Sequence, residues 1–216
     1  TPFNPRASNH RNDDYCEGTA WQWTWFVPHD VDGLVELMGG RDAFIGKLDS
    51  LFTADSKLEG ESTSVDISGL IGQYAHGNEP SHHIAHLYNY VGQPWRTQEI
   101  VDEVLHTLYF NNPDGLSGNE DCGQMSAWYI LNAMGFYQVC PGKPVYSIGR
   151  PLFNEATVHL KDGKSFKVIA HNNSRDNKYV RSIVLNGNKL ETPFFTHQDI
   201  VDGGTLELTM GSEPLK

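Results

Sequence analysis

Three short loop-like stretches carry carboxylates that could do acid–base chemistry: they hold Glu17, Glu79 and the pair Glu120–Asp121. Two carboxyl groups facing one pocket can cleave a glycosidic bond, because one protonates the leaving oxygen while the other activates water or attacks. We therefore expect these three loops, remote in sequence, to converge on one polar pocket.

The second loop, Gly77–Pro80, places its acid at the entrance of a helix. Proline favours the first helical position and holds the residue before it extended. Because glutamate is a poor helix cap, helix stability alone does not explain Glu79. Asn78 and Glu79 together offer oxygen ligands suited to a hard cation such as calcium. The competing interpretation is favourable charge on the helix dipole.

The third loop leads into an apolar helix predicted over Gln124–Met134. Asp121 and Gln124 have the spacing of a capping box, so Asp121 is either a helix cap or a chemical group. Gly118 and Gly123 indicate a tight or closely approached backbone on both sides of it.

Aromatic and imidazole side chains accompany these acids. Trp21, Trp23 and Trp25 alternate, which predicts an extended segment with all three on one face, either a core wall or a sugar-stacking platform. His82, His83 and His86 lack the HExxH pattern and the further ligands of a zinc site, so we expect solvated or hydrogen-bonded histidines.

Bulk properties exclude some partners. The 216 residues contain 16 basic and 27 acidic side chains, giving a net charge of −11 that disfavours nucleic acid. No apolar run reaches the ~18 residues of a membrane span. Three cysteines without a CxxC pair argue against a disulfide framework. The sequence starts at Thr1 with neither a methionine nor a signal segment. We therefore expect Thr1 to be a trimmed or cleaved end.

Hydrophobic periodicity predicts helices followed by strands. The expected helices cover 31–38, 44–52, 84–91, 98–110 with Thr97 as cap, and 124–134. Short alternating runs at 156–160, 165–170, 180–185 and 205–210 predict antiparallel strands, with hairpin turns at 161–163 and 186–187. We expect a helical part over 1–140 and a β-rich scaffold over 141–216.

Three motifs in this order resemble glycoside hydrolase family 92, the calcium-dependent exo-acting α-mannosidases of bacteria. They are Glu17–Asp30, Gly77–His83 and Gly118–Trp128. The resemblance implies the last helices of an (α/α)6 toroid followed by an antiparallel β-rich C-terminal portion. It also implies inverting hydrolysis of terminal α-linked, typically α-1,2-linked, mannose on high-mannose glycans.

The resemblance further implies roles for single residues. Glu17 is expected as general acid, with Glu79 as its rival, and Asp121 as general base. Asn78 and Glu79 are expected to bind Ca²⁺, which holds the 2- and 3-hydroxyls of the sugar. The residues expected to bind substrate are Trp21, Gln22, Trp25, Glu79, His82, His83 and Asn119.

Family members are several times longer and begin with a large β-sandwich domain. This sequence therefore resembles only their C-terminal part, and we expect it to be poorly active without the missing sandwich and first toroid helices. The family also implies a periplasmic, surface or secreted location. The alternative is a non-catalytic helical carbohydrate-binding or scaffold module in which the acids are helix caps.

Overall fold

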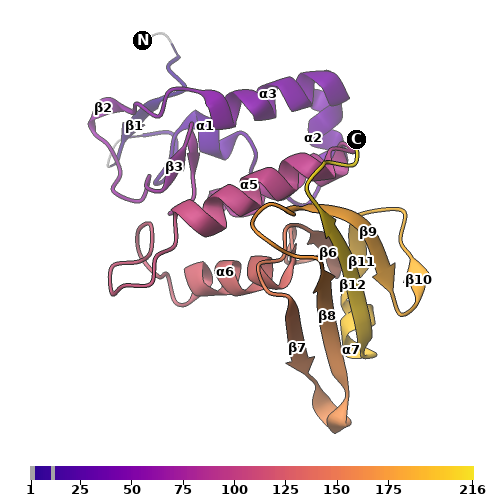
Figure 1. Cartoon of the computed structure of the whole chain (residues 1–216). Helices are drawn as coiled ribbons and strands as arrows, with labels where there is room; N and C mark the ends of the chain where they lie inside the picture. Colours follow the sequence, from indigo (N-terminus) through magenta and orange to yellow (C-terminus); the bar gives the residue numbers. More distant parts are fainter. Residues whose placement is uncertain (1–2, 11–12) are drawn as a thin grey trace. The chain divides into compact units, whose positions relative to one another are not determined.

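The structure is a computed structural model that describes residues 3–10 and 13–216 (Figure 1). It confirms a mixed α and β chain. The chain divides into two compact units. The first unit comprises Thr1–Ile84 and Thr107–Ser126, and the second comprises Ala85–His106 and Ala127–Lys216. These units interleave in sequence.

The helices of the first unit start at identifiable caps. Helix α2 (Val31–Leu37) begins where the Asp30 carboxylate accepts a hydrogen bond from the main-chain nitrogen of Gly33 at 3.0 Å. Helix α3 (Arg41–Thr53) follows Gly39 and Gly40, whose φ angles of 96° and 97° suit only glycine. Both helices agree with the predicted ones.

The tryptophan-rich run corrects one prediction. Residues 20–23 form a short helix, α1 (Ala20–Trp23), instead of the expected extended segment. A capping box drives this choice, because the Thr19 hydroxyl accepts from the main-chain nitrogen of Trp21 while the Gln22 side chain accepts from the main-chain nitrogen of Thr19. Three tryptophans at alternate positions therefore do not share one face.

Short strands and buried side chains complete the first unit. Strand β1 (Ala7–Asn9) pairs in parallel with β2 (Glu59–Ser62), and β3 (Leu70–Ile71) pairs antiparallel with β4 (Tyr74–Ala75). A 3₁₀ turn, η1 (Glu79–Ser81), follows β4. The fully buried large side chains of this unit include Trp25, Phe44, Leu48, Leu51 and Tyr74.

The remaining helices differ in part from expectation. Residues 84–91 form a 3₁₀ turn, η2 (Ile84–His86), and one α turn, α4 (Leu87–Tyr90), in place of one continuous helix. Helix α5 (Pro94–Thr107) starts at proline, so Thr97 lies inside it and is not its cap. Helix α6 spans Gln124–Met134 as predicted, and α7 (His197–Val201) has a Thr196–Asp199 capping box.

Strands of the second unit form two sheets. The first has the order β10 (Asn188–Lys189), β9 (Tyr179–Leu185), β12 (Gly204–Gly211), β8 (Ser165–His171) and β7 (Glu155–His159). The second has the order β11 (Phe194–Thr196), β6 (Val145–Ile148) and β5 (Phe136–Tyr137).

Both predicted hairpins are present within the first of these sheets. One turn contains the short η3 (Lys161–Gly163), with Asp162 at φ 59°, and the other contains Asn186 and Gly187 at φ 50° and 79°. The expectation of purely antiparallel strands is wrong at one place, because β12 pairs in parallel with β8 and antiparallel with β9. Alternating hydrophobicity identifies a strand but carries no information on its direction.

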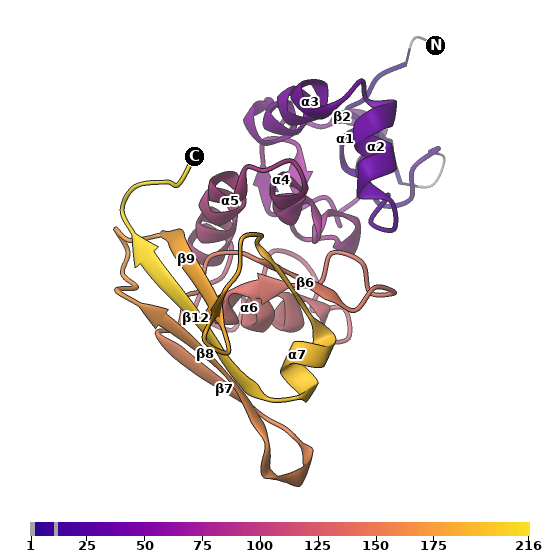
Figure 2. The same cartoon turned by 90° about the vertical axis from the view of Figure 1, so that its right-hand side faces the viewer.

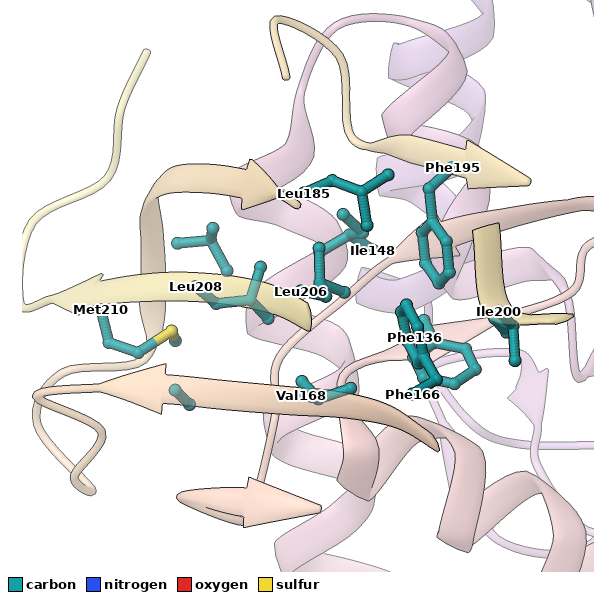
Figure 3. Close-up of a cluster of buried hydrophobic side chains, with 12 residues drawn as sticks. Phe136, Ile148, Phe166, Val168, Leu185, Phe195, Ile200, Leu206, Leu208 and Met210 are labelled. Atoms are coloured by element: carbon teal, nitrogen blue, oxygen red, sulfur yellow. The ribbon is translucent and has the colours of Figure 1, made fainter. Parts of the chain in front are cut away.

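Alternate residues of these strands build one apolar core (Figure 3). Inward-facing residues of β8 and β12 meet Phe136 of β5, Ile148 of β6 and Phe195 of β11, and Ile200 of α7 closes one end. Figure 2 shows β6 and α7 beside the five-stranded sheet.

A buried ion pair joins α5 to the segment after β6 within the second unit. Asp102 Oδ1 lies 2.9 Å from Nε of Arg150, a residue that is 2% exposed. His106 and Arg175 approach the same carboxylate at 3.2 and 3.5 Å. Burial lowers the pKa of Arg150, and the neighbouring Asp102 opposes that shift.

Among the described residues, no helix is long and apolar enough to cross a membrane.

Candidate functional site

The first acid lies in a strained turn ahead of α1. Glu17 is exposed and has a φ angle of 52°, a left-handed conformation that non-glycine residues seldom adopt. The indole nitrogen of Trp23 donates a hydrogen bond to the main-chain oxygen of Cys16 at 2.9 Å, which holds the turn against the helix that follows. The backbone thus presents Glu17 outward.

The second acid-bearing segment binds directly to the first. The side-chain amide of Asn78 donates to the main-chain oxygen of Glu17 at 2.9 Å, although 61 residues separate them in the chain. The Oδ1 atom of Asn78 accepts from the main-chain nitrogen of Glu79 at 3.2 Å and so caps η1. Asn78 is therefore both a local cap and a long-range tie.

The third segment approaches the second through glycines and a serine. The Ser68 hydroxyl donates to the main-chain oxygen of Ser117 at 3.1 Å. A Cβ atom added at Gly118 would lie 3.3 Å from the main-chain oxygen of Gly77, and one added at Gly77 would overlap Ser117. Two glycines thus let these backbones touch, which explains why the sequence places glycine at both positions.

A buried histidine network links the second segment to the start of α6. The Nε2–H group of His82 donates to the main-chain oxygen of His76 at 2.9 Å, so its Nδ1 accepts from the Gln124 amide at 3.0 Å. His76 itself bridges the hydroxyls of Tyr74 and Tyr109 at 2.8 and 2.7 Å. The three acid-bearing segments are thereby held together within the first unit.

Burial keeps these imidazoles neutral. Desolvation lowers the pKa of His82 to about 4 and that of His76 well below its ordinary value. His83 is 4% exposed, and its Nε2–H group donates to the main-chain oxygen of Trp25 at 2.7 Å. Its pKa is likewise lowered to about 4 by desolvation. The expectation of hydrogen-bonded histidines is confirmed.

Helix α6 is capped by an unexpected residue. The Glu120 carboxylate accepts hydrogen bonds from the main-chain nitrogen and the hydroxyl of Ser126, at 3.1 and 3.0 Å. Asp121, which the capping-box pattern favoured, has a φ angle of 50°, and its side chain makes no such bond within the described part of the chain. The capping interpretation of Asp121 is therefore wrong.

Three carboxylates at the converging segments remain available. Within residues 3–10 and 13–216, the side chains of Glu17, Glu79 and Asp121 form no hydrogen bond or ion pair with other protein groups. Glu17 and Asp121 are exposed, and Glu79 is half-buried. Asn119, beside them, is also exposed. An acid without a protein partner is free to exchange a proton or bind a cation.

Two of the expected substrate-binding residues have structural roles in this structure. Trp25 is 0% exposed and packs edge-on against Phe44 at 5.4 Å between ring centroids, so it cannot stack on a sugar. Gln22 is 3% exposed, with its oxygen bonded to Thr19 and its nitrogen to the main-chain oxygen of Gln73. Trp21 is half-buried, with the Lys47 ammonium 4.7 Å from its ring centroid.

The oxygen donors near Glu79 form only part of a calcium site. Calcium takes six to eight oxygens, as a general rule. Glu79 offers its carboxylate, and Asn78 Oδ1 already accepts one hydrogen bond but keeps a second lone pair. No group of three or more His, Cys, Asp or Glu in the described part of the chain is arranged to hold a metal ion. The donors have the right chemistry, but further ligands must come from elsewhere.

Several residues of this site were not singled out from the sequence. Ser68, His76 and Tyr109 connect the segments, yet none has a local pattern that indicates such a role. Glu120 and Gln124 were named from the sequence, but not as the cap of α6 and the partner of His82. The usable signal was indirect: Gly118 and Gly123 predicted a tight or closely approached backbone, and Gly118 does lie against Gly77.

Comparison with known proteins gives a consistent result over nearly the whole chain. The family model for the glycosyl hydrolase family 92 catalytic domain matches residues 1–212. A curated relative from the fungus Arthroderma benhamiae, described as an uncharacterized secreted glycosidase, is 32% identical over 200 residues. That match covers 91% of this chain and 24% of the relative.

Solved structures of proteins from the same family are also similar to this chain. The GH92 α-mannosidase BT3965 from Bacteroides thetaiotaomicron, in complex with mannoimidazole, is 42% identical with a TM-score of 0.92. The match covers 100% of this chain and 29% of that one. The GH92 inverting mannosidase BT2199 from the same organism is 43% identical with a TM-score of 0.80, covering 95% of this chain and 30% of its own. The chain thus spans less than a third of the length of these relatives.

Proposed function

The chain belongs to glycoside hydrolase family 92, and we propose that the full-length protein is an exo-acting α-mannosidase that releases terminal α-linked, in particular α-1,2-linked, mannose. One observation carries this proposal: hydrogen bonds tie together three segments remote in sequence, and the acids Glu17, Glu79 and Asp121, one from each segment, are bonded to no protein group within the described residues. The glycosidase and mannosidase names of the similar proteins agree with it.

In the proposed mechanism Glu17 is the general acid and Asp121 the general base. Glu17 donates a proton to the glycosidic oxygen as the bond to the anomeric carbon breaks. Asp121 removes a proton from the water that attacks the same carbon from the opposite face, so the configuration inverts. The left-handed backbone at both residues supports this assignment, because strained conformations cluster at functional sites.

Calcium is part of the proposal. Glu79 and Asn78 would contribute oxygen ligands to it, and the exposed Asn119 would line the sugar-binding surface. His82 and His83, which are 2% and 4% exposed, would instead act from behind this surface by holding the segments together. When bound, the ion would hold hydroxyl groups of the sugar. Because this chain supplies too few ligands for calcium alone, the remaining ones would come from substrate, water or the rest of the protein.

The wider architecture is proposed in the same way. Residues 1–140 would supply the last helices of an (α/α)6 toroid, and residues 141–216 the β-rich C-terminal portion. Because the chain spans 29% of BT3965, we expect it to be inactive alone for want of a complete pocket. A location outside the cytoplasm is proposed, as for the relative described as secreted.

The non-catalytic alternative lacks its main support. It required the acids to be helix caps and the tryptophans to form a platform, whereas Glu120 caps α6 and Trp25 is buried. The two hypotheses still make opposite predictions for turnover, so one assay separates them.

The test uses the full-length protein and α-1,2-mannobiose, with and without a calcium chelator. We expect Glu17→Gln and Asp121→Asn each to lower kcat by on the order of 10²–10⁴-fold. Proton NMR of the first product should show the inverted anomer. Activity that persists both with chelator and in Asp121→Asn would overturn the proposed mechanism, and binding without any turnover would favour the non-catalytic alternative.

A further inference from the structure

The turn that carries Asp121 has an unusual backbone. Asp121, Cys122 and Gly123 are consecutive, with φ angles of 50°, 56° and 97°. Only glycine adopts this left-handed conformation without a steric penalty, so two strained residues stand in a row. Such a run persists only where the surrounding structure holds it.

The helix after this turn begins without a side chain at its usual capping position. Gly123 immediately precedes α6 and has no side chain to offer to the free main-chain N–H groups of the first turn. The Glu120 carboxylate, which precedes the turn, accepts from one of these N–H groups instead. Its two carboxylate oxygens bind the main-chain nitrogen and the hydroxyl of Ser126, at 3.1 and 3.0 Å. These two bonds, called the clasp below, close a loop that contains residues 121–125.

The same sequence has a competing local structure. With Asp121 as a conventional cap, the helix would begin two residues earlier, at Cys122, and the Asp121 carboxylate would accept from the main-chain nitrogen of Gln124. Instead, the main-chain nitrogen of Gln124 donates to the main-chain oxygen of Asp121 at 3.1 Å. The Gln124 side chain, which a capping box would turn back toward Asp121, is bonded to His82 at 3.0 Å. The clasp by Glu120 thus favours the arrangement in which the Asp121 carboxylate stays unbonded.

We propose that Glu120 is a positioning residue: by binding Ser126 it selects the left-handed turn and the later helix start that leave the Asp121 carboxylate free to act. This inference rests on the proposed role of Asp121 as general base. Glu120 does not contact the reacting atoms in this scheme; it acts through the backbone of its neighbour. Without it, Asp121 would relax into the capping position and be lost to the reaction.

The experiment measures kcat, KM and the thermal midpoint of full-length variants on α-1,2-mannobiose. We expect Glu120→Ala to lower kcat by on the order of 10²-fold with little change in KM, because misplacing one catalytic group by about 1 Å costs that much. Glu120→Gln keeps one acceptor for the Ser126 main-chain nitrogen and should recover part of kcat. Ser126→Ala loses only the hydroxyl bond and should have the smaller defect of the two alanine variants.

A matched control separates positioning from helix stability. Asp199→Ala removes the carboxylate that accepts from Thr196 in the capping box of α7, so it weakens a helix start elsewhere. Both Glu120→Ala and Asp199→Ala should lower the thermal midpoint by a few degrees, and only Glu120→Ala should lower kcat. Wild-type kcat in Glu120→Ala beside an inactive Asp121→Asn would overturn this inference alone. Wild-type kcat in Asp121→Asn would overturn the proposed function and this inference with it.

Discussion

The side-chain amide of Asn78 donates a hydrogen bond of 2.9 Å to the main-chain oxygen of Glu17, so one residue proposed to bind calcium also holds the backbone of the proposed general acid. Glu17 has a left-handed backbone conformation that needs such support. The two roles of Asn78 can be tested separately, because the hydrogen bond to Glu17 needs the side-chain N–H group, whereas calcium binding needs the side-chain oxygen.

Asn78→Asp separates these two roles. Aspartate retains oxygen atoms for calcium but cannot donate to the main-chain oxygen of Glu17. We expect kcat/KM of the full-length enzyme to fall roughly ten- to hundredfold, the cost of an unsatisfied polar group of about 1–3 kcal/mol. Calcium affinity, measured by calorimetry, should be kept or increased. Wild-type kcat/KM in this variant would show that the tie to Glu17 is unimportant.

Gly77→Ala tests the close backbone approach. A Cβ atom there would overlap the Ser68 hydroxyl and the main-chain oxygen of Ser117, so the two segments must separate. We expect a loss of about 1–3 kcal/mol in the free energy of unfolding, typical of overpacking, together with reduced activity. Gly46→Ala in α3 is the control, because nothing lies within 4 Å of the added atom. That variant should be neutral or more stable by up to about 1 kcal/mol. Equal effects at both positions would contradict the packing argument.

The His83 side chain should make stability depend on pH. Burial lowers its pKa from 6.5 to about 4, so below pH 6.5 the unfolded chain takes up a proton that the folded one does not. Stability from this group is therefore complete above pH 6.5 and falls as the pH drops toward 4, by about 3 kcal/mol in all. In His83→Gln, the free energy of unfolding should fall less steeply with acid, by up to about 1.4 kcal/mol per pH unit. An unchanged slope would show that His83 is not buried neutral.

Asp102→Asn tests the buried ion pair of the second unit. The change leaves the 2%-exposed Arg150 guanidinium without its opposing charge, which should destabilise the protein by about 3–5 kcal/mol. Arg175→Gln is the matched comparison: this side chain is 60% exposed and 3.5 Å from the same carboxylate, and should contribute about 0–1 kcal/mol. Denaturant unfolding measures both. Similar losses in the two variants would contradict the distinction between buried and exposed partners.

Much of the fold followed from local patterns. Helices α2, α3 and α6 and the hairpins at residues 161–163 and 186–187 were predictable because their caps, glycines and apolar stripes lie within a few residues of each other. The same holds for the acids, since Glu17, Glu79 and Asp121 were selected by residue type and by their place in short loops. The structural exceptions have different causes. A local capping box overrode the alternation at Trp21–Trp25, and Pro94 starts α5 before Thr97. The parallel β8–β12 pair depends on a partner strand far away in the sequence.

Residue types and short spacings in the sequence by themselves determined the acid-bearing loops and most of the helices and strands. Only the tertiary structure decided which acid caps α6, which aromatic rings are buried and which loops meet. Local rules favoured Asp121 as cap, yet the bonds from Ser68 to Ser117 and from Gln124 to His82 span 49 and 42 residues and fix the turn differently. The physical reason is that two local patterns compete here, the Asp121 cap and the Glu120–Ser126 bonds. The bond from Gln124 to His82, whose partner no short stretch of sequence contains, agrees with only the second of them.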